Sequence, residues 1–270
     1  MFDLKLPLIS ILGLLTILVL VSLVLDYLRL LRRPARIGLW LAMLGIIAGF
    51  FLTATAVMPD NRFYGPAFSE VKTSQKVVAL TFDDGPSEIT EDILGVLEKY
   101  DVKATFFVIG PDSYEANCRL LRISMAGHAI GLHSWSHKYA DIYSSLEAWK
   151  TDIETERIWI ESVTGKTPKV IRLPGGVANS TATPALMKQI LAEIEAEDLT
   201  LCAWNVDGTD SVNQYISAYE IVRRVLTGSR GKDTVVVLLH DYDTRTATAA
   251  ALPTLIEAFR SRGYEFRTFE

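Results

Sequence analysis

The sequence predicts an α/β fold of about seven mostly parallel strands, nearest to a barrel, preceded by a hairpin of two transmembrane helices. Short apolar runs and helical stretches alternate from residue 76 to the end of the 270-residue chain, which is typical of a parallel sheet with helical crossovers. Polar clusters directly follow most of these runs, as they do at the carboxyl ends of barrel strands. Two long uncharged stretches occupy the first 58 residues, and each is long enough for a bilayer span.

The N-terminal hairpin is predicted from length and charge. Residues 7–25 and 39–58 carry no charged side chain, and a helix of about 20 apolar residues crosses a bilayer. The loop between them, residues 26–38, holds four arginines against one aspartate, so the positive-inside rule places it in the cytoplasm and both ends of the hairpin outside. The alternatives are a buried soluble hairpin and a cleaved signal peptide, but the first run is long, its cationic cluster follows it, and a second span comes next.

The charge balance changes after the hairpin. Residues 60–75 mix Gly, Pro and polar side chains without apolar periodicity, so they are predicted to form a linker to the domain at 76–270. Five basic and two acidic residues precede Pro59, which leaves 22 basic and 30 acidic residues beyond it, a net charge of −8. This balance argues against a nucleic acid partner and says little about a neutral glycan.

Each predicted strand is a short apolar run that ends at Gly, Pro or a polar cluster. In chain order the strands are 77–82, 104–110, 128–133, 169–173, 199–206, 234–239 and 264–269. The run TVVVLL at 234–239 has no polar interruption, which is typical of a strand buried on both faces of a parallel sheet.

The helices between these strands are predicted from apolar spacing and from end signals. They cover residues 89–100, 114–125, 145–163, a stretch that begins at 183, then 217–226 and 252–259. Thr183 before Pro184 favours a helix start, because the N–H that proline lacks would have no partner there. Ser217 and Glu220 have the spacing of a capping box, and Gly165 is placed to end the long third helix.

Polar residues follow the strands at the points where the strands end. They are Asp83 and Asp84, His133, Arg172 to Gly176, Asp207 and Asp210, and His240 with Asp241. In a barrel of parallel strands these ends converge on one face, where active sites are built. Neighbouring residues on a strand point to opposite sides, so Asp83 and Asp84 share a site only if the strand has just ended.

Two imidazoles and a carboxylate suggest a metal site. His133 and His137 in HSWSH are four residues apart, and this spacing aims both rings the same way if the segment turns helically. Two His and one Asp form a three-ligand set for zinc or a similar divalent ion with one position left for water. The alternative is a pair of surface or helix-capping histidines, and the paired acids at a neighbouring strand end favour the metal.

These groups suit metal-assisted hydrolysis, in which one carboxylate removes a proton from water and a separate acid protonates the leaving group. His240 is a candidate acid because it emerges from a buried strand on the common face. Asp210 or Asp207 is placed to hold His240 protonated, since a nearby carboxylate raises a histidine pKa. Arg172 is placed to pair with Asp83. For a single Arg or Asp, a structural ion pair is the alternative.

The chain has two cysteines, Cys118 and Cys202, too few and too far apart for a metal knuckle or a disulfide framework. Two states stay open from the sequence: a disulfide formed in an oxidising compartment, and two unpaired thiols on or near core elements.

Five motifs carry a resemblance to a known family. TFDDGP at 81–86, HSWSH at 133–137, RLPGG at 172–176, WNVDGTD at 204–210 and LLH at 238–240 occur in this order. In type, order and spacing they resemble the polysaccharide deacetylases of carbohydrate esterase family four, the NodB homology domain. The resemblance covers residues 76–270 and leaves out the hairpin.

The resemblance implies a distorted (β/α) barrel and a role for each matching residue. Asp83 would be the general base, with Arg172 as its ion-pair partner, and His240 the acid, tuned by Asp210. The implied metal ligands are Asp84, His133 and His137, and Gly175 and Leu238 would lie on the substrate and oxyanion side. The implied cofactor is one divalent ion, zinc by expectation, with cobalt, nickel or manganese as alternatives. The implied reaction removes N-acetyl groups from N-acetylglucosamine-type units of peptidoglycan or a related cell-wall glycan, outside the cytoplasmic membrane.

Two departures from the family pattern concern the sugar groove. Gly175 and Ser211 stand where many members carry aromatic residues, so the identity of the glycan stays open. Trp135 and Trp204 are alternative ring faces or core residues. A de-O-acetylase or deformylase of a lipid-linked sugar or exopolysaccharide is the alternative enzyme. A non-catalytic glycan-binding scaffold is the alternative from another class, although it predicts the loss of a ligand or base.

Overall fold

The computed structural model describes residues 75–110, 113–212, 215–242 and 246–269. The predicted hairpin, with spans at 7–25 and 39–58 and the loop at 26–38, lies outside the described residues, as does nearly all of the predicted linker. None of the helices that the structure describes combines the length and the apolar character of a bilayer span.

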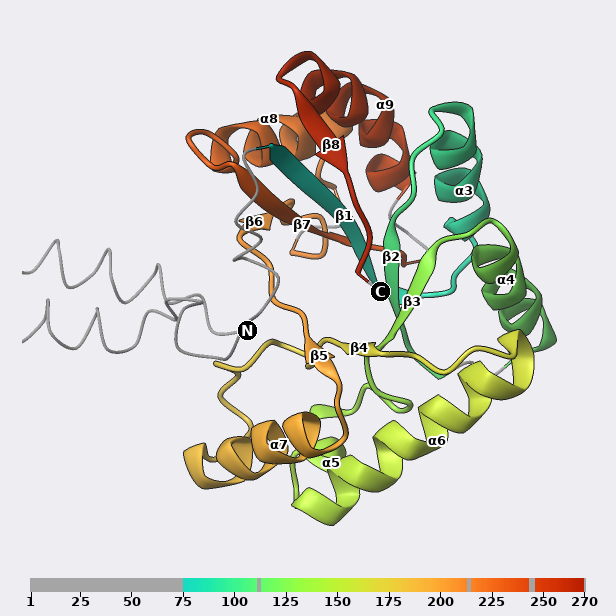
Figure 1. Ribbon diagram of the computed structural model, residues 1–270, viewed down its shortest axis with the longest axis vertical. Helices are drawn as coiled ribbons and strands as arrows, with labels where there is room; N and C mark the ends of the chain where they lie inside the picture. The colour runs from blue at the N-terminus through green and yellow to red at the C-terminus, as the bar shows by residue number, and fades with distance from the viewer. Residues whose placement is uncertain (1–74, 111–112, 213–214, 243–245, 270) are drawn as a thin grey trace, which may run out of the picture. The chain divides into compact units, whose positions relative to one another are not determined.

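The strands form one parallel sheet (Figure 1). They are Lys76–Gly85 (β1), Thr105–Val108 (β2), Ala129–Leu132 (β3), Val170–Ile171 (β4), Thr200–Leu201 (β5), Val206–Asp207 (β6), Thr234–His240 (β7) and Tyr264–Phe266 (β8). Their order is β5-β4-β3-β2-β1-β7-β6, and β8 pairs with β1. Every pairing among the described strands is parallel, so the predicted parallel α/β architecture is confirmed. The central strand, β1, carries the two adjacent aspartates.

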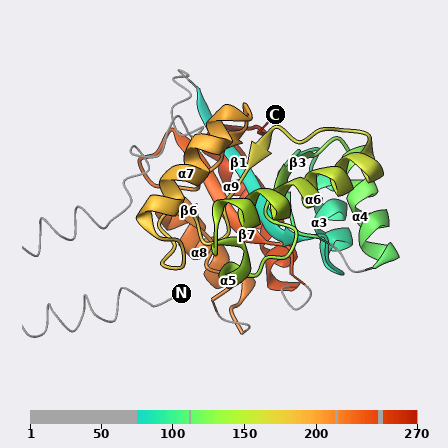
Figure 2. The same ribbon diagram turned by 90° about the horizontal axis from the view of Figure 1, so that it is seen from below.

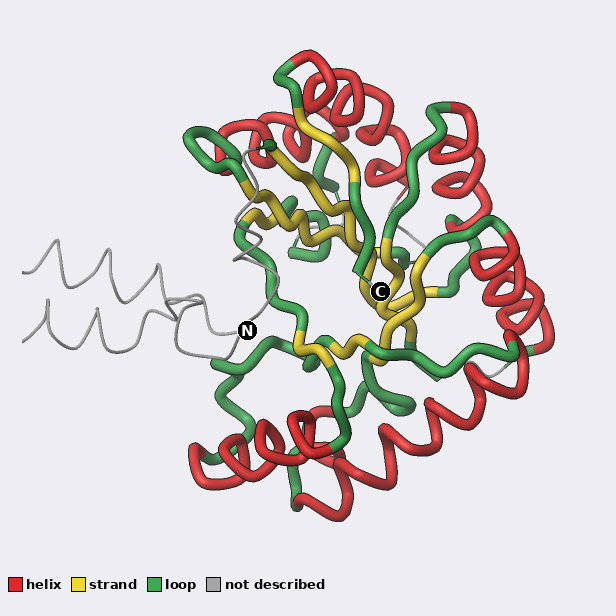
Figure 3. Tube along the Cα trace, viewed as in Figure 1, coloured by secondary structure: helices red, strands yellow, loops and turns green. Residues whose placement is uncertain are grey.

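The strand predicted at 199–206 is two strands. β5 pairs with β4 and β6 pairs with β7, at opposite ends of the sheet order. The four residues between them run from one edge to the other, as the trace in Figure 3 shows. Asn205 joins this crossing to β7, because its backbone N–H donates to the Val236 carbonyl and its side chain bonds the backbone of Thr234 and Val236. The two edge strands, β5 and β6, are therefore linked by the chain segment between them and not by a pairing in the described sheet. The barrel is distorted at this point.

The helices lie outside the strands (Figure 1), and Figure 2 views the domain from the side of α5, α6 and α7. They are Thr90–Lys99 (α3), Tyr114–Met125 (α4), Tyr139–Ile142 (α5), Leu146–Thr164 (α6), Pro184–Ala196 (α7), Ala218–Gly228 (α8) and Thr246–Ser261 (α9). Thr183 and Ser217 are N-caps, as predicted, and accept hydrogen bonds from the N–H groups of Leu186 and Glu220. The short helix α5 was not predicted, because four residues are too few for a periodic pattern.

The main hydrophobic core joins the sheet to the helices. Val78, Leu80 and Phe82 of β1 are fully buried in it, and Phe82 stacks on Phe106 of β2 with ring centroids 5.0 Å apart. Burying each large apolar side chain contributes about 1.5–3 kcal/mol. The strand that delivers the candidate site is therefore firmly anchored.

The alternate residues of β1 point to the inside of the curved sheet. Ala79 belongs to a smaller apolar cluster there, and the next two inward side chains, Thr81 and Asp83, both accept hydrogen bonds from Arg172. Side chains alternate along a strand, so burying residues 78, 80 and 82 against the helices directs Asp83 inward.

Candidate active site

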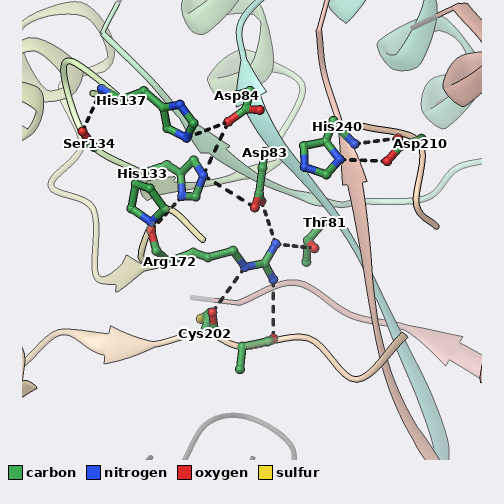
Figure 4. A network of polar contacts seen from close by, with 12 residues as sticks. Thr81, Asp83, Asp84, His133, Ser134, His137, Arg172, Cys202, Asp210 and His240 are labelled. Carbon is green, nitrogen blue, oxygen red and sulfur yellow. Dashed lines mark hydrogen bonds and ion pairs between the residues drawn. The ribbon is translucent and has the colours of Figure 1, made fainter. Parts of the chain in front are cut away.

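A bulge in β1 brings Asp83 and Asp84 to one site. The pairing register with β2 shifts between Asp83 and Gly85, and Asp84 has a left-handed backbone with φ 73°. The extra residue of a bulge re-aims a side chain, so both carboxylates lie beside the imidazole of His133 (Figure 4). The expectation that the strand ends before the two acids was wrong, since β1 continues to Gly85.

Gly85 is required by a close approach of β7. A Cβ on Gly85 would collide with the side chain of Asp241, the residue that follows β7. The buried Asp241 carboxylate accepts hydrogen bonds from the hydroxyls of Ser87 and Thr90 at 2.7 and 2.6 Å. Asp241 therefore ties the carboxyl end of β7 to the segment that follows β1.

Asp84, His133 and His137 form a group with metal-ligand geometry. The Oδ1 atom of Asp84 lies 3.5 Å from Nε2 of His133 and 3.3 Å from Nε2 of His137, and the three ligand atoms lie within 4.8 Å of one another. Oδ1 is buried and has no hydrogen-bond partner among the described residues, which is costly unless a cation is bound there. Two imidazole nitrogens and one carboxylate oxygen are a donor set for zinc. The residues therefore fit a divalent cation.

The electrostatics of this group follow from its burial and its charges. Burial alone raises the pKa of Asp84, but the imidazoles of His133, His137 and His240 outweigh it and hold this pKa well below its usual range. Burial opposes protonation of His133, yet the carboxylates of Asp83 and Asp84 raise its pKa. Burial dominates at His137 and lowers its pKa, which favours the neutral ring that a metal requires.

The ring of His133 is oriented by a backbone carbonyl. Its Nδ1 lies 2.7 Å from the carbonyl oxygen of Arg172, so Nδ1 carries the proton and donates it. In the neutral ring, Nε2 is then the unprotonated nitrogen, and it faces Asp84. Outer hydrogen bonds of this kind fix the tautomer of metal-binding histidines.

Two carboxylates of α6 hold the HSWSH loop, and sequence reasoning missed both. The fully buried Glu156 accepts hydrogen bonds from the N–H groups of His133 and Ser134 at 2.8 and 2.7 Å. One turn earlier, Asp152 accepts from the Ser134 hydroxyl at 2.6 Å and from the Trp135 N–H at 2.8 Å. Burial raises the pKa of Glu156 although the two backbone donors lower it. An acidic pair at i and i+4 on a predicted amphipathic helix was the available signal.

Arg172 and Asp83 form a buried ion pair, as expected. The Arg172 side chain is 1% exposed and lies 2.7 Å from Oδ1 of Asp83. The guanidinium also donates to Thr81 and to the Cys202 carbonyl, and lies 4.2 Å from the centre of the Phe107 ring. A buried charge is stable when it is paired and its donors are satisfied, so Asp83 is held in one position.

His240 pairs with Asp210 and not with Asp207. Nδ1 of the His240 ring lies 2.8 Å from Oδ1 of the fully buried Asp210. Oδ2 of Asp210 accepts hydrogen bonds from the backbone N–H of His240 and from the Thr248 hydroxyl. Burial opposes protonation, but the hydrogen bond and charge of Asp210 raise the pKa of His240 to about 9. Asp207 instead accepts from the N–H of Thr209. His240 is thus a protonated imidazole at neutral pH.

Gly175 and Leu238, expected on the substrate side, differ in their surroundings. Gly175 has φ 72°, and the ring of Tyr139 fills the space beside it. Burial and the charges of Asp84 and Asp83 raise the pKa of Tyr139 to about 12, so its phenol stays protonated. Leu238 is 6% exposed in β7 and pairs in register with Thr81.

The structure also shows where the two candidate tryptophans and the two cysteines lie. Trp135 packs edge-on against Trp159, with ring centroids 5.8 Å apart, and the centre of the Trp204 ring lies 5.6 Å from the Arg172 guanidinium. Both are partly buried residues packed against core clusters. Cys118 is exposed, Cys202 is buried, and both are free thiols.

Comparisons with known proteins give relatives of one kind. The family model for polysaccharide deacetylases matches residues 70–192. A peptidoglycan-N-acetylglucosamine deacetylase of Bacillus cereus is 31% identical over 199 residues, which are 72% of this chain and 70% of that protein. One of Listeria monocytogenes is 34% identical over 206 residues, which are 76% of this chain but 40% of that longer protein.

Solved structures agree with these relatives. The catalytic domain of a peptidoglycan N-acetylglucosamine deacetylase from Eubacterium rectale has a TM-score of 0.68 and 33% identity, over 74% of this chain and 93% of that one. A polysaccharide deacetylase from Bacillus cereus has a TM-score of 0.64 and 30% identity, over 73% and 93%. Fold and site together define a hydrolytic enzyme that works at the carboxyl ends of a distorted parallel barrel. The chain belongs to the polysaccharide deacetylase family.

Proposed function

We propose that the protein hydrolyses N-acetyl groups from N-acetylglucosamine-type units of a cell-wall polysaccharide, peptidoglycan or a related glycan. One observation carries the proposal: the group of Asp84 and two histidines lies beside a carboxylate held by Arg172, and the imidazole of His240, paired with Asp210, lies at the same site (Figure 4). The names of the Bacillus cereus and Listeria relatives support this substrate class.

Asp84, His133 and His137 are the proposed ligands of one divalent cation. Zinc is expected for two nitrogen donors and one oxygen donor, and cobalt, nickel or manganese are alternatives. When bound, such a cation lowers the pKa of a water molecule and polarises the acyl carbonyl.

Asp83 is the proposed general base. Its carboxylate pairs with the Arg172 guanidinium and sits next to the ligand group, so it is placed to take a proton from the attacking water. The oxygen of that water forms the new bond to the acyl carbon. Gly175 and Leu238 are proposed on the substrate side, and the Gly175 N–H is a donor for the negative charge that develops on the acyl oxygen.

His240 is the proposed general acid. The C–N bond breaks as the imidazolium gives a proton to the amine nitrogen, which leaves acetate and a free amino sugar. Asp210 keeps the imidazole protonated and oriented through its bond to Nδ1, so that Nε2 donates. The proton that Asp83 takes from water balances the one that His240 gives away.

The hairpin and the domain boundaries are part of the proposal. Residues 1–59 would anchor the protein in the cytoplasmic membrane and residues 60–75 would lead to a catalytic domain at 76–270 on the extracytoplasmic side. The charge distribution of the loop at 26–38 supports this arrangement. A cell-wall substrate requires the same location.

The direct test is acetate release by the purified protein from peptidoglycan fragments and chitooligosaccharides. The protein is first stripped with a chelator and then assayed with and without added zinc, cobalt, nickel or manganese. We expect release that depends on the added ion. Absence of acetate from every acetylated glycan, with metal present, would overturn the proposal.

A second candidate function is removal of O-acetyl groups. The structural neighbours include a carbohydrate esterase of Streptococcus mutans and an esterase-family domain of a multidomain xylanase, with TM-scores of 0.61 in both cases. The same acid, base and ligand groups suit an ester or a formamide. Comparing kcat/KM on matched acetamide, ester and formamide sugars, including a lipid-linked one, distinguishes these activities.

A further inference from the structure

Tyr139 lies between two parts of the candidate site. Its ring packs edge-on against the ring of His137, with centroids 5.5 Å apart and an interplanar angle of 88°. Its Cε1 atom lies 2.8 Å from the point where a Cβ on Gly175 would stand. The tyrosine ring therefore occupies the space that a side chain at position 175 would need.

The ring is held in this place by the residue that follows its own helix. Tyr143, directly after α5, packs against Tyr139 with ring centroids 6.0 Å apart. The buried Tyr143 hydroxyl donates a 2.9 Å hydrogen bond to the carbonyl oxygen of Pro174, the residue before Gly175. Tyr139 is thus fixed against His137, Tyr143 and the Gly175 turn, and a ligand that contacts it meets a preorganised surface.

The hydroxyl of Tyr139 differs from that of its neighbour. It lies 3.1 Å from the same Cβ point on Gly175, yet within the described residues it has no hydrogen-bond partner. Tyrosine hydroxyls in partly buried positions normally find one. The side chain therefore presents an unused donor beside the Gly175 turn and a ring wall next to the ligand group.

We propose that Tyr139 contacts the substrate, with its hydroxyl donating a hydrogen bond to the N-acetylated sugar and its ring forming the wall of the groove beside Gly175. This inference rests on the proposed function and names a residue that determines binding in the same site. Sugars are recognised by placed hydrogen-bond donors and by aromatic faces, and a ring that is already fixed loses little conformational entropy when a sugar binds.

The test measures binding in a background without turnover. The full chain with Asp83→Asn is titrated with the N-acetylglucosamine tetramer, and the Kd is compared with those of Asp83→Asn/Tyr139→Phe and Asp83→Asn/Tyr100→Phe. Tyr100 is the matched control, because it follows α3 at the amino end of the sheet and its hydroxyl donates to Glu257 of α9. We expect Tyr139→Phe to weaken binding by about 3- to 10-fold, the range for one neutral hydrogen bond, and Tyr100→Phe to leave it unchanged.

Turnover and folding provide further readouts. In the protein with Asp83 intact, Tyr139→Phe should raise KM by the same factor and change kcat less than about twofold, since the chemistry is untouched. The melting temperature and the metal content should stay at wild-type values.

An unchanged Kd and KM in Tyr139→Phe would overturn the inference, as would a loss of binding explained by lower metal content. If the wild-type protein releases no acetate, the proposed function fails, and the binding titration still decides the role of Tyr139. Absence of tetramer binding by the Asp83→Asn protein would overturn the inference, whereas acetate release from peptidoglycan fragments tests the proposed function separately.

Discussion

Asp83 and Asp84 are neighbours in the chain, but their surroundings predict different effects of substitution. Asp83→Asn removes the proposed base and leaves the three ligand atoms in place, so kcat should fall by at least about 100-fold while one metal ion stays bound. Asp84→Asn, the matched control, should lose the metal. Metal analysis and acetate release on both variants measure this difference. An active Asp83→Asn protein would contradict the base assignment, and a wild-type protein with no turnover to lose would favour the scaffold alternative.

The pair of His240 and Asp210 predicts a pH dependence. The pKa of His240 is raised to about 9 in the folded protein, above its ordinary value near 6.5, so the acid form is present through neutral pH and is lost as the pH rises through 9. The same pair stabilises the fold fully below about pH 6.5, and this contribution disappears towards pH 9. Activity should therefore decline on the alkaline side near pH 9.

Asp210→Asn tests whether the Asp210 carboxylate is the cause of the raised pKa of His240. Without the carboxylate charge, the pKa of His240 should drop, and the alkaline limb of the kcat profile should move to lower pH together with the loss of rate. Thr248→Val is the control, because it removes a neutral donor to Asp210 and leaves the charge in place. An alkaline limb that stays at the same pH in Asp210→Asn would show that another group titrates.

The sequence predicted the polar residues of the site better than the residues that position them. His133, His137 and Asp84 could be grouped as candidate ligands because ligand-type side chains follow strand ends, and parallel strands bring such ends together. Glu156 and Tyr139 could not be assigned. Glu156 acts through backbone N–H groups of a loop distant in sequence, and a tyrosine two residues after a ligand gives no signal until α5 turns its ring towards Gly175.

At the scale of elements, α6 is predicted to govern metal affinity through the HSWSH loop. Glu156→Gln puts an amide nitrogen where a carboxylate oxygen now accepts the N–H of His133 or Ser134. Loss of an outer partner typically costs 10- to 100-fold in metal affinity, and an unsatisfied buried donor destabilises the fold by about 1–3 kcal/mol. A competition titration with a zinc indicator measures the first effect and urea unfolding the second.

The matched control lies on the same helix. Glu154 has a side chain that is 58% exposed and contacts only Arg157 among the described charged groups, so Glu154→Gln should change neither quantity measurably. Equal zinc affinity in Glu156→Gln and wild type would mean that Asp152 alone holds the loop.

Two elements mark where sequence patterns stop being informative. The run at 199–206 has the apolar character of one strand, but its middle crosses between the two sheet edges, and Asn205 bonds β7 through its side chain. A pattern of side chains records burial and not which neighbour a backbone pairs with, so the split into β5 and β6 could not be predicted. The bulge at Asp84 is similar, because its register shift depends on the pairing with β2.

At the scale of the whole molecule, the order of strands and helices was predictable and the closure of the sheet was not. Uninterrupted apolar strands alternating with helices leave few arrangements besides a parallel sheet with helices outside. Which strands form the edges depends on long-range packing, which a single sequence does not record. The carboxyl-end location of the site follows from parallel pairing alone, and this explains why residues from five strands could be grouped correctly.

The proposed topology of the complete chain can be tested with the protein's own cysteines. Cys118 is exposed on α4 and Cys202 is buried, so a membrane-impermeant maleimide added to intact cells without an outer barrier should label the wild-type protein at Cys118 and leave Cys118→Ser unlabelled. Adding Arg33→Cys to Cys118→Ser places a thiol in the loop at 26–38, which the positive-inside rule assigns to the cytoplasm. That thiol should react only after the membrane is permeabilised. Labelling of Cys118 only after permeabilisation, or of the loop thiol in intact cells, would contradict the proposed extracytoplasmic location. The candidate active site at the carboxyl ends of β1, β3 and β7 would then lie in the cytoplasm, which holds no cell-wall glycan.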